Sequence, residues 1–383
     1  MGYRRIVFVV NVILMLGLLC SPIAAAHTYP DYLNAINKAA DRLVALQSPC
    51  DFGWDWRVTG LTQHSDNPSA TNLYGVTALG LIDAYLKTYK SEYFNAAKNV
   101  ADFITYGNPS AGDFYNGLYY DFGHGPSDYY WGYSFDYKFL LRFSEVSGDT
   151  SYRDYALAAW AWQRTNRPVY NDGNEVQFYN YFVSHVNHGF AGWGVSDFAM
   201  AAWEMGDVNW ARALASVVSN NLGNIMSSPT LSDLGMAWSL RMFVTIDPVS
   251  YASEITSLIN QLKADQHPDG YWDDDNSEGN AQTTAYAVMG LWAAGEYEAA
   301  RKGAEWLLAN QLANGGWEAS PTEYSETDSE ALQALVYAMP SPPVGGIWSP
   351  INAFELLAPW IALASATTIS IAVGARHLPR KRL

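Results

Sequence analysis

The stretch KGAEWLLANQLANGGW, residues 302–317, combines an amphipathic helical segment with a glycine-rich turn that ends in tryptophan. Its second half recurs in part as QHPDGYW at residues 266–272. Units that recur along a chain are typical of folds assembled from helical pairs, in which each pair buries its apolar face against its neighbours. The stretch therefore predicts a repeated arrangement of helical hairpins. A more divergent copy near the start of the chain consists of Leu43, Gln47, Gly53 and Trp54.

Twelve segments of the chain have helical periodicity, with small and apolar residues recurring every three or four positions. Nearly uncharged segments rich in Ala, Gly and Leu alternate with segments that carry charges on one face. Uncharged helices are buried all round, whereas amphipathic helices face solvent on one side. Six inner and six outer helices predict an all-α protein, an (α/α)6 barrel or toroid of six helical hairpins, with an open superhelix as the alternative. The segments are 31–47, 70–87, 92–105, 131–147, 151–163, 190–205, 208–221, 230–243, 249–265, 281–294, 297–311 and 327–338.

The connectors between these segments predict where function lies. Turns from an inner to an outer helix are short, as at Gly295-Glu296, but most connectors from an outer to the next inner helix are long and rich in aromatic and acidic residues. In a barrel of hairpins the long loops gather at one rim, above the first residues of the inner helices. Loops held by a rigid scaffold often carry function. The long loops are 48–69, 106–130, 164–189, 266–280 and 312–326.

The repeat resembles the QW motif of squalene–hopene cyclase and other triterpene cyclases, because residues 302–317 carry Lys-Gly, Trp-Leu, Gln and Gly-x-Trp at the spacing of that motif. The resemblance implies the α/α toroid of the terpenoid cyclase and protein prenyltransferase superfamily, over residues 31–340 for the fold and about 250–338 for the motif. It also implies structural roles: the Gln ties the end of an outer helix to the loop, and the Trp stacks beneath it.

The catalytic motifs of those two families are not matched. Class II cyclases share an Asp-x-Asp-Asp acid, whereas the nearest stretch here, residues 273–276, reads Asp-Asp-Asp-Asn and lies in a QW loop. Protein prenyltransferases bind zinc through Asp, Cys and His, and residues 318–335 contain neither Cys nor His. Because zinc sites of this kind need nitrogen or sulfur ligands, the sequence argues against a zinc site. The fold alone implies neither activity.

Both ends of the chain carry apolar segments that predict export and anchoring. Residues 1–26 have a basic start, an apolar run and a small-residue cleavage site, as in a signal peptide. Residues 356–375 are apolar and uncharged, long enough to cross a bilayer as a transmembrane helix, and a basic tail follows at 376–383. The toroid at 27–339 and a linker at 340–355 are then predicted to lie outside, at the cell surface, with the basic tail in the cytoplasm.

The charge of the chain argues against one class of partner. The whole sequence has a formal net charge of −16, and without residues 1–26 and 355–383 the remaining 16 basic and 37 acidic residues leave −21. Binding of nucleic acid needs a basic face and is not predicted, and a polyanionic substrate is disfavoured for the same reason. Because acidic and aromatic residues share the long loops, the sequence favours a carboxylate-rich face. No organic cofactor is predicted.

Acidic residues of the rim are the main candidate catalytic groups. Crowded carboxylates have raised pKa values, which suits a general acid, and glycoside hydrolysis uses a pair of them. For Asp328 the favoured interpretation is capping of the last inner helix. The run from Asp273 to Asp275 is most often a solvated turn, and a calcium loop through Asp273 and Asp275 is a weaker alternative. The candidate catalytic residues are Asp273, Asp274, Asp275, Glu326, Asp328 and His188.

Tryptophan and tyrosine can present flat ring faces to sugars, and six-hairpin barrels commonly carry extracellular glycan hydrolases, epimerases and lyases. The leading hypothesis is a hydrolase or lyase that binds or processes an extracellular polysaccharide. The alternatives are a noncatalytic module that binds a surface component and a squalene-cyclase-like enzyme acting on a membrane isoprenoid. The candidate substrate-binding residues, several of which are also explained as core or QW residues, are Trp54, Trp56, Tyr130, Trp131, Tyr181, Trp193, Trp272 and Trp317.

Overall fold

The computed structural model describes residues 27–58, 69, 73–107, 133–273, 279–319 and 322–341. Contacts within the chain divide it into one unit that ends at Pro340 and a second that begins at Ser341. The predicted signal peptide and transmembrane helix lie outside the described residues. Among the helices of the described ranges, none combines the length and the apolar character that crossing a bilayer requires.

The predicted helices are confirmed, since all twelve are present in the described part of the chain with ends close to those predicted. Three further elements occupy connectors that the sequence predicted as loops: η3 (Pro168–Tyr170), α7 (Glu175–His185) and α10 (Leu222–Met226). The twelve helices are α2 (Tyr29–Leu46), α3 (Tyr74–Thr88), α4 (Ser91–Tyr106), α5 (Tyr133–Ser147), α6 (Ser151–Asn166), α8 (His188–Glu204), α9 (Val208–Asn220), α11 (Ser232–Ile246), α12 (Ala252–Asp265), α13 (Gly279–Ala293), α14 (Tyr297–Ala309) and α15 (Ser325–Ala338).

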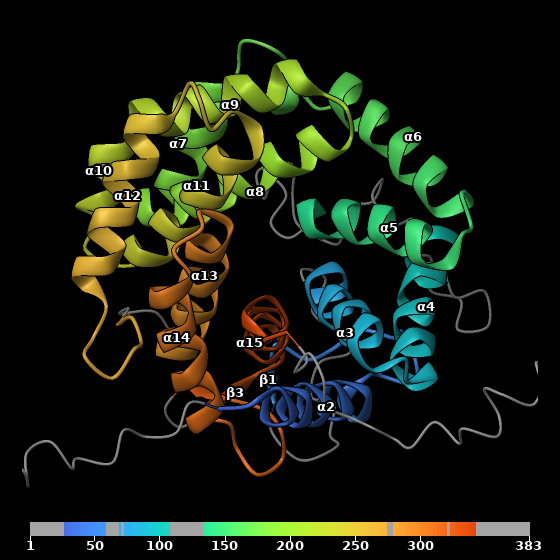
Figure 1. Cartoon of the computed structure of the whole chain (residues 1–383). Coiled ribbons are helices and arrows are strands. Elements are labelled where there is room, and N and C mark those ends of the chain that lie inside the picture. Colours follow the sequence, from blue (N-terminus) through green and yellow to red (C-terminus); the bar gives the residue numbers. More distant parts are fainter. Residues whose placement is uncertain are drawn as a thin grey trace, which may run out of the picture. The chain divides into compact units, whose positions relative to one another are not determined.

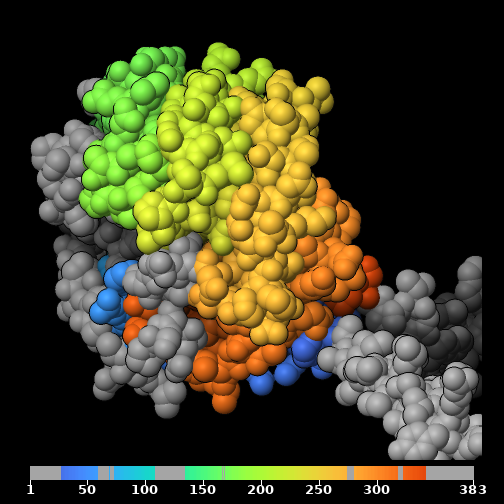
Figure 2. Space-filling model, turned by 90° about the vertical axis from the view of Figure 1, so that its left-hand side faces the viewer, coloured from blue at the N-terminus to red at the C-terminus, as the bar shows by residue number. Residues whose placement is uncertain are grey.

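Six of the described helices form an inner ring (Figure 1). Helices α3, α5, α8, α11, α13 and α15 follow one another around it, and α15 packs against α3 to close it. The outer helices α4, α6, α9, α12 and α14 each follow an inner helix, and α2 completes the outer layer by packing against α15 and α3. From the side, the green, yellow and orange parts of the chain form a continuous wall (Figure 2). The described residues thus form an α/α toroid.

The two kinds of helix predicted from composition occupy the two layers. In the inner helix α15 every residue from Ser325 to Leu335 is buried, whereas in the outer helix α12 the buried residues are Leu258 and Leu262. This difference is the one expected between a helix packed on all sides and an amphipathic helix packed on one. Helix α15 nevertheless carries three acidic residues within its buried part, and buried carboxylates need partners.

The QW repeat ties neighbouring outer helices together. Gln311 Nε2 donates hydrogen bonds to Gly315 O and to Ala35 O of α2, both at 2.9 Å. Trp317 is buried, and its Nε1 donates to Leu307 O of α14 at 2.8 Å. These are the structural roles that the resemblance implied. The other copies repeat them through Gln266 to Gly270 O and Ala299 O, Trp272 to Leu262 O, Gln47 to Phe52 O and Ala96 O, and Trp54 to Leu43 O.

The copy at residues 302–317 closes the ring, because it joins α14, near the end of the toroid sequence, to α2 at its start. The turn after Gln311 lies so close to α2 that a Cβ on Gly315 would overlap Lys38 O. Gly315 also has a φ of +103°, in the region that favours glycine. Both observations explain why the turn of this motif contains glycine.

A small antiparallel sheet, which the sequence did not predict, joins the first and last long loops. Its strands are β1 (Arg57–Val58), β3 (Thr322–Tyr324) and β2 (Glu318–Ala319) in that order, and Val58 lies opposite Glu323. Strands of two or three residues are too short to show an alternating pattern in the sequence. The sheet supports the same closure of the ring as the QW repeat.

Buried charged residues also lie at this closure. Arg42 of α2 forms a two-point ion pair with Glu323 of β3, with Nε–Oε1 and Nη2–Oε2 distances of 2.7 and 2.9 Å. Asp328 Oδ1 accepts a hydrogen bond from the backbone N–H of Trp317 at 2.7 Å. Burial and the negative charge of Glu323 raise the pKa of Asp328 well above its usual range. Asp328 therefore helps to hold the last QW turn against α15.

Replacing Gly315 by alanine tests the close approach at the closure. An alanine there would meet both an unfavourable φ and the Lys38 carbonyl, whereas Gly295 has a φ of +83° and no neighbouring atom within 4 Å of its Cβ position. We expect Gly295→Ala to lower the free energy of unfolding by about 1–2 kcal/mol, and Gly315→Ala to lower it by about 2 kcal/mol more. Urea unfolding measures both values, and equal losses would contradict the close contact.

The raised pKa of Asp328 predicts a dependence of stability on pH. The native protein keeps a proton that the unfolded chain releases near pH 3.8, so this contribution to stability is complete below that pH and is lost as pH rises toward the native pKa. Asp328→Asn keeps the oxygen that faces Trp317 and cannot titrate. From about pH 4 to about pH 7 we expect the wild-type protein to lose stability relative to Asp328→Asn, by at most about 1.4 kcal/mol per pH unit. A constant difference between the two unfolding curves would contradict the assignment.

Candidate functional site

Aromatic side chains from inner helices that are two places apart in the ring meet in its interior. Phe135 of α5 stacks on Trp238 of α11 with 6.4 Å between ring centroids, and Trp193 of α8 meets Tyr286 of α13 edge-on at 6.3 Å. Neither pair of helices is adjacent in the ring, so these contacts cross its interior. Charged residues of the same helices lie beside them. We call the axial cluster the set Phe135, Lys138, Trp193, Asp197, Trp238, Tyr286, Glu326 and Glu330.

Tyr286 and Glu330 form the first polar pair of the axial cluster. The Tyr286 hydroxyl donates a hydrogen bond to Glu330 Oε1, and the Tyr286 side chain has no exposed surface. Burial, with the charges of Glu330 and Glu326, raises the pKa of Tyr286 far above its usual value, so the phenol stays protonated. Glu326 lies one helical turn before Glu330, on the same face of α15. The axis thus holds one proton donor and two carboxyl groups.

Lys138 and Asp197 form the second polar pair. They make a buried ion pair between α5 and α8, and Trp238 Nε1 donates to Asp197 Oδ1 at 2.8 Å. Lys138 Nζ also lies 4.0 Å from the centroid of the Phe135 ring and 5.5 Å from that of Trp238. Burial lowers the pKa of Lys138, and the charge of Asp197 opposes that shift. The ring faces and the indole N–H offset part of the cost of burying the two charges.

The aromatic members pack closely around these pairs. Trp238 and Tyr286 meet edge-on with 4.6 Å between centroids, and both are nearly or fully buried. Trp193 is partly exposed and also contacts Phe190, at 5.2 Å between centroids. Among the described residues of the cluster, Trp193 therefore presents the indole ring that a ligand can reach.

The predicted catalytic residues are distributed over several places. Glu326 belongs to the axial cluster. Asp328 is fully buried at the ring closure beside Glu323. Tyr324 occupies the N-cap position of α15, so Asp328 is not the N-cap residue of that helix. Asp273 is exposed. Asp274 and Asp275 lie outside the described residues, so the calcium prediction at Asp273 and Asp275 stays a prediction.

His188 and Tyr181 lie on two consecutive helices, α8 and α7. His188 is the first residue of α8 and is partly exposed, with its Nδ1 3.0 Å from the hydroxyl of Tyr179. Tyr181 belongs to α7, and its ring lies 6.1 Å from that of His185. The contact of His188 matches the local hydrogen-bonding role that is the simpler account of a lone histidine.

The predicted tryptophan platforms divide into three groups. Trp193 belongs to the axial cluster, and Trp56 is partly exposed at the small sheet, 5.2 Å from the Tyr324 ring and 5.4 Å from the Arg57 guanidinium carbon. Tyr130 and Trp131 lie outside the described residues. The remaining three are at most 1% exposed and have no ring face to offer a ligand, so we place them in the packing of the ring: Trp54, Trp272 and Trp317.

Sequence reasoning missed most of the axial cluster because it looked for function in the loops, whereas these residues lie on inner helices. A signal was present. In α8, Asp197 is the one acidic residue before Glu204, and in α5 Lys138 stands between Tyr137 and Phe139. A single charge within an apolar helix must find a buried partner, and this indicates a polar site.

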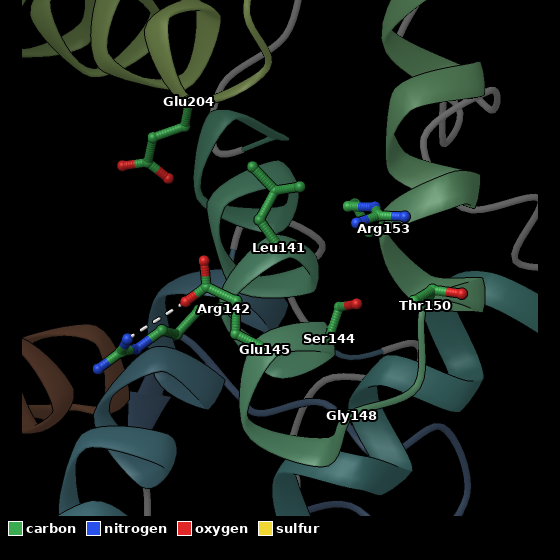
Figure 3. Close-up of a pocket in the computed structure, with 8 residues that line it drawn as sticks. All are labelled: Leu141, Arg142, Ser144, Glu145, Gly148, Thr150, Arg153 and Glu204. Atoms are coloured by element: carbon green, nitrogen blue, oxygen red, sulfur yellow. Dashed lines mark hydrogen bonds and ion pairs between the residues drawn. The ribbon is translucent and has the colours of Figure 1, made fainter.

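A polar groove lies at the other end of the inner helices (Figure 3). Its volume is about 630 Å³, and a neighbouring cavity of about 350 Å³ shares Arg142 with it. Arg142 pairs with Glu145 at 3.4 Å, and burial raises the pKa of Asp83 in the second cavity to about 6 and also raises the pKa of Glu204. Within the described ranges, no three His, Cys, Asp or Glu side chains converge as metal ligands would.

No protein-family model and no curated protein matches the sequence. Solved structures do match. An inactive variant of an α-1,6-mannanase from Salegentibacter sp., in complex with α-1,6-mannotriose, has 10% identity and a TM-score of 0.54, over 80% of this chain and 99% of that one. A family 88 glycosyl hydrolase from Bacteroides vulgatus has 13% identity and a TM-score of 0.52, over 82% and 99%.

A type II terpene cyclase from Scytonema, in complex with geranylgeranyl dihydroxybenzoate, has 14% identity and a TM-score of 0.50, over 82% of this chain and 98% of that one. Identities this low establish a common fold and leave the chemistry open. The resemblance that the QW repeats carry is thereby confirmed for the architecture: the chain has the α/α-toroid fold that glycan hydrolases and terpene cyclases share.

Proposed function

We propose that this protein binds and processes a glycan at the axial cluster, as a hydrolase or a lyase. The observation that carries the proposal is the buried hydrogen bond from Tyr286 to Glu330, with Glu326 one turn away, beside the partly exposed indole of Trp193. A phenol and two carboxyl groups can hold and move protons, and an indole ring can stack on the apolar face of a sugar.

The chemistry follows from the residue types. Hydrolysis of a glycosidic bond needs one carboxyl group to protonate the leaving oxygen and a second to act as nucleophile or to activate water. Glu326 and Glu330 are the described pair that can share these tasks. Tyr286 donates to Glu330 and so stabilises its ionised form, which suits Glu330 as the base or nucleophile and Glu326 as the acid.

The structural neighbours support a glycan as ligand. One of them is an α-1,6-mannanase crystallised with α-1,6-mannotriose as a variant, described as inactive, in which two adjacent aspartates are replaced by asparagine. This chain has adjacent aspartates at Asp273, Asp274 and Asp275 in a long loop. They stay in the proposal as a second carboxylate set, with Asp273 and Asp275 also proposed as ligands of a calcium ion.

The place of action is proposed from the ends of the sequence. Residues 1–26 are proposed as a signal peptide and 356–375 as a transmembrane helix, with the toroid at 27–339 outside the cell and the basic tail at 376–383 inside. A polysaccharide of the cell surface or its surroundings would then be in reach. The short linker at 340–355 would hold the toroid near the membrane.

A squalene-cyclase-like activity is less well supported by the axial residues. Cyclases stabilise carbocations with aromatic ring faces, but here the Lys138 ammonium already lies over the rings of Phe135 and Trp238. A second cation at those faces would be repelled by Lys138. A noncatalytic glycan-binding module remains the competing outcome, and the same experiment separates it.

Neutral substitutions at the two glutamates test the proposal. The purified full-length protein is incubated with a panel of neutral and acidic polysaccharides, and new reducing ends report hydrolysis while ultraviolet absorbance reports unsaturated lyase products. We expect Glu326→Gln and Glu330→Gln each to lower turnover at least about 100-fold, because each removes a proton-transfer group. Glu298→Gln on the exposed face of α14 is the matched control and should keep full activity.

Four outcomes separate the functions. Full activity in both glutamine variants would contradict the axial site, and loss in Asp274→Asn instead would transfer the chemistry to the loop aspartates. Binding without turnover by the wild-type protein would favour the noncatalytic module. Neither binding nor turnover on any glycan would contradict the proposed function.

A further inference from the structure

Two buried polar atoms that helix α8 contributes to the axial cluster have no hydrogen-bond partner in the part of the chain that the structure describes. They are Nε1 of Trp193, a donor, and Oδ2 of Asp197, an acceptor. Trp193 and Asp197 are four residues apart in α8 and therefore lie on the same face of that helix, toward Tyr286 and Trp238. One helix face thus presents an unused donor and an unused acceptor side by side.

Leaving such atoms unpaired is costly. Asp197 is 1% exposed, and its other oxygen, Oδ1, already receives Lys138 and the indole of Trp238. Asp197 forms an ion pair with Lys138, and the oxygens of a carboxylate in such a pair are strong acceptors. A buried polar atom without a partner costs about 1–3 kcal/mol, and native proteins rarely contain two of them together unless a ligand or a water completes them.

The chemistry of the missing group follows from the two atoms. A hydroxyl can accept a hydrogen bond from an N–H and donate one to a carboxylate oxygen at the same time. An apolar ligand can do neither, and an anionic oxygen can accept from Trp193 but is repelled by Asp197. The partly exposed ring of Trp193 adds a surface on which the CH face of a sugar ring can stack.

We infer that Trp193 and Asp197 form a hydroxyl-binding subsite that selects a neutral sugar unit, with Trp193 supplying both the ring face and the N–H. The inference rests on the proposed function, because it names the glycan class that the axial cluster takes. It gives Trp193 and Asp197 a role in specificity, while Glu326, Glu330 and Tyr286 keep the proton chemistry.

The test measures binding of neutral oligosaccharides to the full-length protein. The panel is α-1,6-mannotriose together with trisaccharides of glucose, galactose and xylose, and a trisaccharide of a uronic acid represents the anionic class. Trp193→Phe keeps an aromatic ring and removes the N–H, so we expect it to weaken binding of the preferred neutral member about tenfold. Trp203→Phe, on the same helix beneath Arg212, removes an indole N–H away from the axis and should bind as the wild type does.

Asp197→Asn is the second variant, and we expect it to weaken binding more than Trp193→Phe, because the hydroxyl loses a charged acceptor. Asp197→Asn also leaves Lys138 without its counter-charge, so thermal unfolding is used to check that this variant folds. If Asp197→Asn does not fold, the result for Trp193→Phe decides the test. A nuclear magnetic resonance spectrum adds a direct readout. The indole N–H signal that Trp193→Phe removes should shift when the bound sugar is added to the wild-type protein.

Each outcome bears on the subsite separately from catalysis. Weaker binding in Trp193→Phe, with a shift of its indole signal, supports the subsite even where the wild type shows no turnover. If Trp193→Phe and the wild type bind every sugar with equal affinity, the subsite is overturned, even where turnover persists. Water alone then supplies the hydrogen bonds to Trp193 Nε1 and Asp197 Oδ2. Preference for the uronic acid trisaccharide, or no binding of any neutral member, also overturns the inference.

Discussion

The hydrogen bonds of Gln311 are the constraint on which the toroid depends. A closed ring requires the end of the helical sequence to reach its beginning, and this side chain joins the turn at Gly315 to Ala35 of the first helix. The same bonding by Gln266 and Gln47 links α12, α14, α2 and α4 in series. Stripes of alanine and leucine alone fit one another at several offsets along the helix axis, so these bonds to backbone carbonyls fix how far each outer helix is shifted along the next.

A fixed outer layer also fixes how each inner helix is rotated about its own axis, and that rotation decides which side chains meet in the middle. Phe135 reaches Trp238 and Trp193 reaches Tyr286 because their helices present these faces across the ring. Charged groups can be kept there only with partners, which is why the Lys138–Asp197 pair is supported by an indole N–H and two ring faces. The way the ring closes therefore also decides which side chains lie at its axis.

The sequence predicted the architecture well and the axial site poorly, for physical reasons. Helix existence follows from local periodicity, and the roles of Gln311 and Trp317 follow from a motif only a few residues long, so both could be inferred without coordinates. Tyr286 and Glu330 are far apart in the chain. No local sequence pattern shows how their two helices are rotated about their own axes, so their contact could not be inferred. Trp272 shows the opposite difficulty: an aromatic residue in an acidic loop suggests a sugar platform, but its indole N–H is bound to the outer helix beneath it.

The buried acidic residues at the axis affect ligand binding differently from the acidic residues of the outer surface. The Lys138–Asp197 pair is neutral as a unit, and the carboxyl group that we assign as the base, Glu330, lies beside it under the Tyr286 hydroxyl. Repulsion between charges on the outer surface is screened within about 8–10 Å at physiological salt, whereas charges in a poorly solvated interior are screened much less. Added salt would therefore weaken the repulsion between an acidic glycan and the carboxylates of the outer surface. Repulsion by the buried carboxylate of the base would persist. Selection against anionic sugars should then depend on Glu330 and only weakly on ionic strength, whereas selection by the overall surface charge should weaken as salt is added.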